Sequence, residues 1–198
     1  MINIIDYEGG NLFSVVKAFE FLGAEPKVIT RPEEYEAGKI VIPGVGDFGD
    51  AMRALQERNF PLFLHEKAQE GVLLIGICVG VQILFQSSEE APDTKGLSFF
   101  RNAVKRFSPG GKIPHMGWNT LDFHSENPLL YNVENGSYVY FAHSYYIPVA
   151  SNDYEIAHCH YSDSFTAVVN RDNIYGVQFH PEKSQKTGLQ ILKNFIEL

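Results

Sequence analysis

The sequence predicts an α/β fold: an open, mostly parallel sheet with helices on both faces, to which the second half of the chain adds antiparallel strands. In the first half, short apolar runs of strand length alternate with segments whose apolar residues recur every three or four positions. That order is typical of parallel sheets covered by helices. In the second half, short runs rich in tyrosine, valine and phenylalanine partly alternate with period two, as antiparallel strands do. No segment is long enough to separate two domains, so we expect one domain over residues 1–198.

The elements of the first half follow one another closely. Residues 2–5 form an apolar run that ends at Asp6, and a helical pattern over 12–22 ends at Gly23. Strands are predicted over 27–30 and 39–42, the second one stopped by Pro43 and Gly44. Next come a helix carrying Phe48, Met52 and Leu55, a second helix over 62–68, and an apolar strand over 72–77.

The second half contains six short runs of strand character and a final helix. The runs cover 103–107, 118–123, 137–142, 154–160, 165–169 and 174–179. They are predicted to extend the same sheet in antiparallel fashion or to pack beside it. The helix spans 185–197, with Leu189, Leu192 and Phe195 on one face.

Composition excludes several classes of protein. The chain is 44% hydrophobic and 20% charged, as in ordinary globular domains, and its net charge of −8 argues against a general binder of nucleic acid or anionic membranes. No apolar run is long enough for a membrane span, and the amino terminus lacks the basic stretch of a signal peptide. Two cysteines cannot form a disulfide framework. We therefore expect a cytoplasmic protein.

Cys78 is the candidate nucleophile. It lies in Gly76-Ile77-Cys78-Val79-Gly80, between an apolar strand and a segment of helical length, which is the context of a nucleophile elbow. The turn is so sharp that side chains two residues to either side would collide with neighbouring elements. A thiol at a helix N-terminus is favoured as thiolate. The alternative is a buried structural cysteine, which is our interpretation of Cys159.

His180 is the candidate base, and Glu182 the group that orients it. The histidine lies just past a strand, at the carboxyl end where open α/β sheets place their sites. Glu182 follows after Pro181 and could receive the imidazole N–H. On spacing alone, a loop histidine without a catalytic role is the commoner outcome, so the interpretation depends on pairing with Cys78.

Backbone N–H groups near the elbow are candidates for an oxyanion hole. The loop Pro43-Gly44-Val45-Gly46 follows a strand and supplies one donor, and the N–H of Val79 supplies the other. An ordinary turn or a phosphate-binding nest would look the same, but the Gly-Lys-Ser/Thr of a P-loop is absent. His158 and His160 alternate on one strand without a third ligand, so we expect no metal and no cofactor.

These motifs together resemble the class I (triad) glutamine amidotransferases over essentially the whole chain. Within that family, four further segments resemble the glutaminase subunits of imidazole glycerol phosphate synthases, which serve histidine biosynthesis. These segments are 6–11, 114–119, 143–146 and 180–184. The chain departs from the family pattern at Glu8, Val79 and Val81, none of which is a reacting group.

The resemblance implies a mechanism and a partner. Cys78 would attack the amide carbon of L-glutamine, with His180 as proton carrier and Glu182 as its support. Gln82, with the backbone near Ser144 and Tyr145, would hold the amino and carboxylate groups of the substrate. Ammonia would pass to a cyclase subunit, a (β/α)₈ barrel. The residues implied to face that partner or line the ammonia channel are Asn11, Trp118, Asn119, His143 and Lys183.

Three other functions stay open at this point. The chain could serve another synthase, of the anthranilate or aminodeoxychorismate type. It could be a γ-glutamyl hydrolase with the same triad and no channel, fully active alone. It could also be a catalytically silent binding module, against which the intact Cys78, His180 and Glu182 argue. Equally, Trp118 could simply belong to the core and Lys183 could be a solvated charge.

Overall fold

The computed structural model describes residues 1–8, 12–109, 111–123, 126–149 and 154–198. Its helices are α1 (Leu12–Phe21), α2 (Phe48–Glu57), α3 (Phe60–Gln69), α4 (Val79–Gln82) and α5 (Gln185–Glu197), with 3₁₀ turns η1 (Pro32–Glu34), η2 (Pro128–Leu130) and η3 (Pro181–Lys183). The strands of the first half are β1 (Ile2–Ile5), β2 (Pro26–Ile29), β3 (Lys39–Ile42), β4 (Leu74–Ile77) and β5 (Ser87–Ser88). Those of the second half are β6 (Ala103–Arg106), β7 (His115–Thr120), β8 (Tyr138–His143), β9 (Tyr145–Pro148), β10 (Glu155–His160), β11 (Ser164–Arg171) and β12 (Ile174–Val177).

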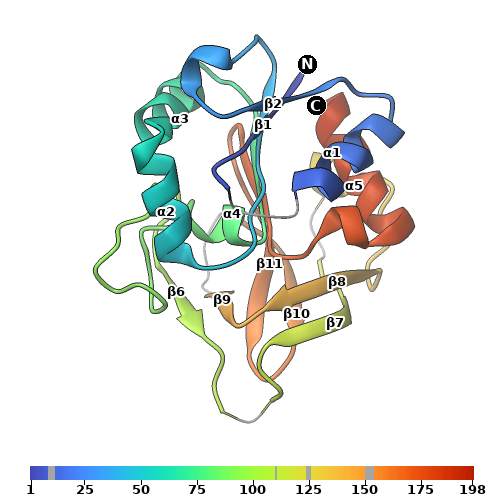
Figure 1. Cartoon of the computed structure of the whole chain (residues 1–198). Helices are drawn as coiled ribbons and strands as arrows, with labels where there is room; N and C mark the ends of the chain where they lie inside the picture. Colours follow the sequence, from blue (N-terminus) through green and yellow to red (C-terminus); the bar gives the residue numbers. More distant parts are fainter. Residues whose placement is uncertain (9–11, 110, 124–125, 150–153) are drawn as a thin grey trace.

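One large sheet forms the centre of the molecule. Its strand order is β2-β1-β3-β4-β12-β11-β9-β6-β5, with β10 paired to β11. Strands β2, β1, β3, β4 and β12 run parallel, and β11 is antiparallel to β12. In Figure 1, α1 and α5 cover one side of this sheet, and α2 and α3 cover the other. The predicted fold class is confirmed.

Burial explains the layered arrangement. Every residue of β1, β4 and β12 is buried, so these strands need cover on both faces, which the helices provide. The first and last helices of the chain, α1 and α5, lie on the same side of the sheet (Figure 1). Because these strands are parallel, their carboxyl ends meet at one edge of the sheet.

A second, two-stranded sheet is made by β7 and β8. The strands are antiparallel, and their register places His115 opposite His143 and Trp118 opposite Tyr140. Figure 1 shows this sheet beside the end of the large one, close to β10. It covers the edge of the large sheet where β4 and β12 end.

The structure differs from the sequence prediction in the second half. The run at 174–179 becomes β12, which pairs parallel with β4 as well as antiparallel with β11. The strand predicted over 118–123 is β7, which begins earlier at His115. Strands β5 and β9 were not predicted. Among the described residues, no helix is long and apolar enough to cross a membrane.

Candidate active site

Cys78 lies at the carboxyl end of β4, on a backbone turn that strains the residue. Its φ and ψ are 55° and −111°, a conformation that residues with a Cβ rarely adopt. The flanking glycines allow the turn, since a Cβ on Gly76 would overlap the carbonyl of Gly80, and a Cβ on Gly80 would overlap the carbonyl of Ile42. The thiol is buried, and its Sγ lies 4.0 Å from the carbonyl oxygen of Ala142 on β8.

The helix that follows Cys78 is shorter than the sequence predicts. Helix α4 has four residues and ends at Gln82. A helix of one turn carries only a small macrodipole.

His180 and Glu182 come to Cys78 because β12 is the parallel neighbour of β4. Ile77 pairs with Val177, and the N–H of Cys78 donates to the carbonyl of Val177 at 2.9 Å. His180 then follows β12 at the same edge, close enough to Cys78 for the thiol to raise the pKa of its ring. Its Nδ1 lies 2.9 Å from Oε1 of Glu182, and both side chains are almost fully buried.

The electrostatics of this group favour a charged imidazole. Burial by itself lowers the pKa of His180, but the neighbouring Cys78 and Glu182 outweigh burial and raise the pKa to about 10. The ring therefore holds its proton at neutral pH. A nucleophile, a proton carrier and an orienting carboxylate in contact can perform covalent acyl transfer.

The loop predicted to supply an oxyanion donor packs directly on the elbow. The N–H of Val79 donates to the carbonyl of Gly44 at 3.3 Å, so this candidate donor is already used in the structure. Gly44 lies so close to the Tyr7 hydroxyl and to the backbone of Gly80 that a Cβ would not fit. Gly46 is exposed and has a φ of 105°.

A cavity of about 160 Å³ opens at Cys78. Eight of its lining residues are among those predicted from the sequence: Val45, Gly46, Cys78, Val79, Gln82, His143, Ser144 and Tyr145. Nε2 of Gln82 donates to the carbonyl of Tyr145 at 2.9 Å and to Oε1 of Gln178 at 3.1 Å. The cavity is smaller than the roughly 300–1,000 Å³ of pockets for drug-sized ligands, which suits a small metabolite.

Sequence reasoning missed Glu90, which also lines this cavity. Its Oε2 accepts the backbone N–H of Phe48 at 2.8 Å, and burial raises the pKa of the carboxyl group. Glu90 belongs to the loop after β5, where neither periodicity nor motif spacing marks it. Three other cavity residues were not assigned to the site: Pro114 and Met116, which belong to the family segment 114–119, and Ala142, at the end of the strand predicted over 137–142.

The residues implied to face a partner are placed differently from one another. Trp118 is 45% exposed on β7, Lys183 is exposed, and Asn119 is half-buried. Asn11 lies outside the described residues. His143 differs from the expectation, because its side chain is only 5% exposed and packs among Phe107, Phe141 and Phe165. Its position on the inner face of β8 explains this burial.

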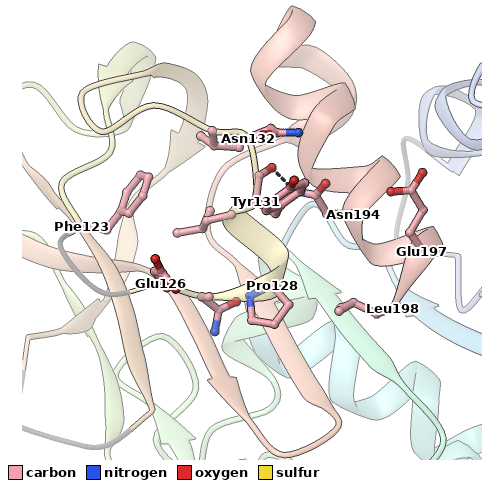
Figure 2. A pocket seen from close by; sticks show the side chains of 11 residues that line it. Phe123, Glu126, Pro128, Tyr131, Asn132, Asn194, Glu197 and Leu198 are labelled. Atoms are coloured by element: carbon pink, nitrogen blue, oxygen red, sulfur yellow. Dashed lines mark hydrogen bonds between the residues drawn. The ribbon is translucent and has the colours of Figure 1, made fainter.

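A larger cavity of about 880 Å³ lies elsewhere, between η2 and the end of α5 (Figure 2). It shares no lining residue with the cavity at Cys78. Its walls include Phe123, Tyr131 and Leu198. The Asn194 amide in its wall donates to the carbonyl of Tyr131 (Figure 2) and also to that of Leu129. Nothing in it matches the chemistry predicted from the motifs.

Possible metal ligands do not gather in the described part of the chain. No group of three or more His, Cys, Asp or Glu side chains is arranged there to hold a metal ion. His158 and His160 instead approach carboxylates, Glu155 at 3.4 Å and Asp122 at 3.7 Å respectively. The thiol of Cys159 is buried, which raises its pKa to about 12.

Comparison with known proteins agrees with the motifs. The family model for glutamine amidotransferase class-I matches residues 3–198. The imidazole glycerol phosphate synthase subunit HisH of Caldanaerobacter subterraneus is 43% identical, over 100% of this chain and 98% of its own length. The protein of the same name from Desulfitobacterium hafniense is 50% identical, over 98% of this chain and 93% of its own length.

The fold is also similar to that of solved structures. A solved crystal structure of a glutamine amidotransferase superposes with a TM-score of 0.78 at 18% identity, covering 99% of this chain and 97% of that one. The resemblance predicted from the sequence is confirmed. The chain belongs to the class I glutamine amidotransferase family.

Proposed function

We propose that this chain is the glutaminase subunit of imidazole glycerol phosphate synthase, in which it releases ammonia from L-glutamine for a cyclase subunit. The observation that carries the proposal is the buried contact of Cys78, His180 and Glu182 beside a cavity of metabolite size. Full-length relatives at 43–50% identity carry the name of that synthase's subunit. A subunit acts within a complex, so the chain has a partner.

The chemistry follows from the triad. The Cys78 sulfur attacks the side-chain amide carbon of glutamine, and His180 gives its proton to the nitrogen as the C–N bond breaks and ammonia leaves. The product is a γ-glutamyl thioester. Water then attacks this thioester, and His180 takes its proton while the sulfur leaves, so that glutamate is released and the site is restored. Glu182 keeps the ring oriented and charged.

The loop at Gly44 acts as a gate for this chemistry. With the Val79 N–H bonded to the Gly44 carbonyl, this predicted donor is not available to a developing oxyanion. Rotation of the peptide units at Gly44, Val45 and Gly46 frees that N–H and aims a second one at the cavity. Glycine on both sides of Val45 permits this rotation at low cost. The gate therefore opens when glutamine or the partner's substrate favours the rotated state.

Polar groups of the cavity hold the substrate's two ends. Both hydrogens of the Gln82 amide are used within the protein, which leaves its Oε1 to accept from the α-ammonium group of glutamine. The Glu90 carboxylate lines the same cavity and provides a negative charge for the positive α-ammonium group. The backbone around Ser144 and Tyr145 receives the α-carboxylate.

The outer face of the β7–β8 sheet is the surface for the cyclase, a (β/α)₈ barrel. Met116 is 65% exposed and also lines the cavity at Cys78, so this face adjoins the site of ammonia release. Trp118 and Tyr138 extend the exposed apolar surface, and aromatic and Met side chains are enriched at protein interfaces. The exposed Lys183 adds a polar contact, whereas the Asn119 amide is bonded on the inner side, to His115 and to the carbonyl of His160. Transfer through a dry passage keeps ammonia unprotonated and nucleophilic.

Two further expectations belong to the same proposal. The chain works as one domain over residues 1–198, because the site takes side chains from both of its sheets. No cofactor and no metal take part. The cytoplasmic location stays a prediction of the sequence.

The decisive experiment compares two nitrogen sources. With the barrel subunit and its nucleotide substrate, the wild-type chain supports formation of imidazole glycerol phosphate and aminoimidazole carboxamide ribotide from either glutamine or ammonium salts. Cys78→Ala abolishes only the glutamine-dependent rate. Cys159→Ala, which removes the other buried thiol, keeps both.

Labelling with a glutamine-like electrophile adds a direct reading of the nucleophile. The reagent modifies Cys78 and leaves Cys159 unmodified. A Cys78→Ala complex that still uses glutamine would overturn the proposal. Full activity of the chain without any partner would instead favour a stand-alone γ-glutamyl hydrolase.

A further inference from the structure

Two buried histidines, His115 and His143, form a hydrogen-bonded pair that the proposed chemistry does not use. They lie opposite each other on β7 and β8, and Nδ1 of His115 is 3.1 Å from Nε2 of His143. Both are nearly inaccessible to solvent. The His115 ring stacks between Phe141 and Tyr161, with centroid distances of 4.9 and 4.0 Å. Polar rings so deeply placed are costly unless every hydrogen bond is made.

The partners of the pair determine which nitrogen atoms carry hydrogen. Nδ1 of His143 lies 2.8 Å from the carbonyl oxygen of Tyr145, which only accepts, so this nitrogen carries the hydrogen. In the neutral ring, Nε2 of His143 is then an acceptor, and Nδ1 of His115 must donate to it. Nε2 of His115 accepts in turn from the Asn119 amide at 3.4 Å. All donors point in one direction, from Asn119 toward Tyr145.

Neutral rings are required for this order, and the surroundings keep them neutral. Burial lowers the pKa of His115 to about 4. Burial also lowers the pKa of His143 to about 3, aided by the charges of His115 and His180, although the bond to Tyr145 acts in the opposite direction. Neither ring therefore gains a second proton near neutral pH.

The chain of bonds ends at the proposed substrate site. The Tyr145 carbonyl that accepts from His143 also accepts from Nε2 of Gln82. If the His143 ring lost its N–H, or carried hydrogen on the other nitrogen, two lone pairs would face each other across this contact. The carbonyl would turn away, and the Gln82 amide would lose a partner that fixes its orientation in the cavity.

We propose that His115 and His143 are positioning residues, which hold the Tyr145 carbonyl and thereby orient the Gln82 amide for binding glutamine. The inference rests on the proposed function. We call this chain of hydrogen bonds, from Asn119 through His115 and His143 to the Tyr145 carbonyl, the relay. Its far end, Asn119, belongs to the β7–β8 sheet that faces the proposed partner. The relay thus ties the geometry of the substrate site to the state of that sheet.

The kinetic test separates binding from chemistry in the reconstituted synthase. His115→Phe keeps an aromatic ring in the stack but removes the donor to His143. We expect KM for glutamine to rise about five- to tenfold, the size of one net hydrogen bond, with kcat within about twofold of wild type. His115→Asn, whose amide nitrogen can take the place of Nδ1, brings KM back toward the wild-type value.

Tyr161→Phe is the matched control for packing. It keeps the ring stacked on His115 and removes only a hydroxyl that donates to the carbonyl of Lys112 at 2.7 Å. KM for glutamine stays at the wild-type value in this variant. An equal rise in KM for Tyr161→Phe and His115→Phe, or an unchanged KM in His115→Phe, would overturn the inference.

Nuclear magnetic resonance of the full chain labelled with ¹⁵N-histidine provides a reading that packing alone does not determine. Both rings should appear as Nδ1–H tautomers whose shifts stay constant between pH 8 and pH 5.5. An Nε2–H tautomer in either ring, or a titration midpoint near 6.5, would refute the relay. Absence of glutaminase activity in the wild-type complex would instead refute the proposed function, so the two failures are distinguishable.

Discussion

The contact between Glu182 and His180 makes the sharpest prediction about the chemistry. Glu182→Gln replaces the carboxylate by a neutral group of the same shape, 2.9 Å from Nδ1 of the ring. Both side chains are almost fully buried, so solvent cannot replace the lost charge. Without that charge, the pKa of His180 falls from its raised value, because Glu182 is one of the groups that raise it.

The size of the effect follows from the kind of bond that is lost. A hydrogen bond to a charged group contributes about 1.5–3 kcal/mol, which corresponds to roughly a 10- to 150-fold loss in kcat when it supports the reacting state. The loss grows with pH. A raised pKa keeps the ring protonated until the pH reaches that value, so lowering the pKa moves the loss of the proton, and of activity, to lower pH.

The assay is release of glutamate by the reconstituted synthase, measured from pH 6.5 to 9.5 for wild type and Glu182→Gln. The ratio of variant to wild-type kcat should decrease as pH rises, and the alkaline limb of the variant's profile should lie at lower pH. Urea unfolding of both proteins controls for folding. A folded variant with kcat within threefold of wild type and an unshifted alkaline limb would refute this reasoning.

Three further predictions concern stability. Gly80→Ala forces a methyl group onto the Ile42 carbonyl and should lower the free energy of unfolding by about 1–3 kcal/mol. We expect Tm to fall by at least about 2 °C and glutaminase activity to be lost; an unchanged Tm would contradict this prediction. Tyr7→Phe removes a buried hydroxyl that has no hydrogen-bond partner among the described residues, so Tm should stay constant or rise by a few degrees, and a clear fall would contradict this. Because burial lowers the pKa of His115 to about 4 and of His143 to about 3, the unfolded chain alone binds these protons between about pH 6.5 and 4. The free energy of unfolding should therefore fall by up to about 1.4 kcal/mol per pH unit for each histidine as pH is lowered through that window, and the slope from urea unfolding should be smaller in His115→Phe/His143→Phe; equal slopes would refute the assignment.

Elements with a local signal were predictable from the sequence. The helix predicted over 185–197 is α5, and the strand predicted over 39–42 is β3, with the same bounds. Periodicity and the glycine or proline at each end are properties of neighbouring residues, so they can be identified without knowledge of the fold. Strand pairing is not local. The run at 174–179 looks like the antiparallel runs before it, yet β12 lies beside β4 because the chain returns to the centre of the sheet.

The candidate site likewise has parts that the sequence predicts and parts that depend on tertiary packing. The elbow at Cys78 and the approach of His180 follow from glycine spacing and from the rule that parallel strands end at one edge. The bond between the Gly44 carbonyl and the Val79 N–H depends on how two loops pack, and no residue type in the sequence predicts that packing. His143 was expected at the partner surface because it belongs to a family motif. Its burial depends on the register of β7 and β8, which places it opposite His115 on the inner face.

The register of β8 also decides the geometry of the triad itself. The carbonyl of Tyr140 accepts the backbone N–H of His180 at 2.9 Å, and the N–H of Tyr140 donates to the Ser184 hydroxyl. Two residues later, the Ala142 carbonyl faces Sγ of Cys78. One strand of the small sheet therefore contacts both reacting residues, although these residues are themselves carried by the large sheet. Since Trp118 packs edge-on against Tyr140 with centroids 5.9 Å apart, any contact on that exposed indole acts on the strand that supports the proton carrier.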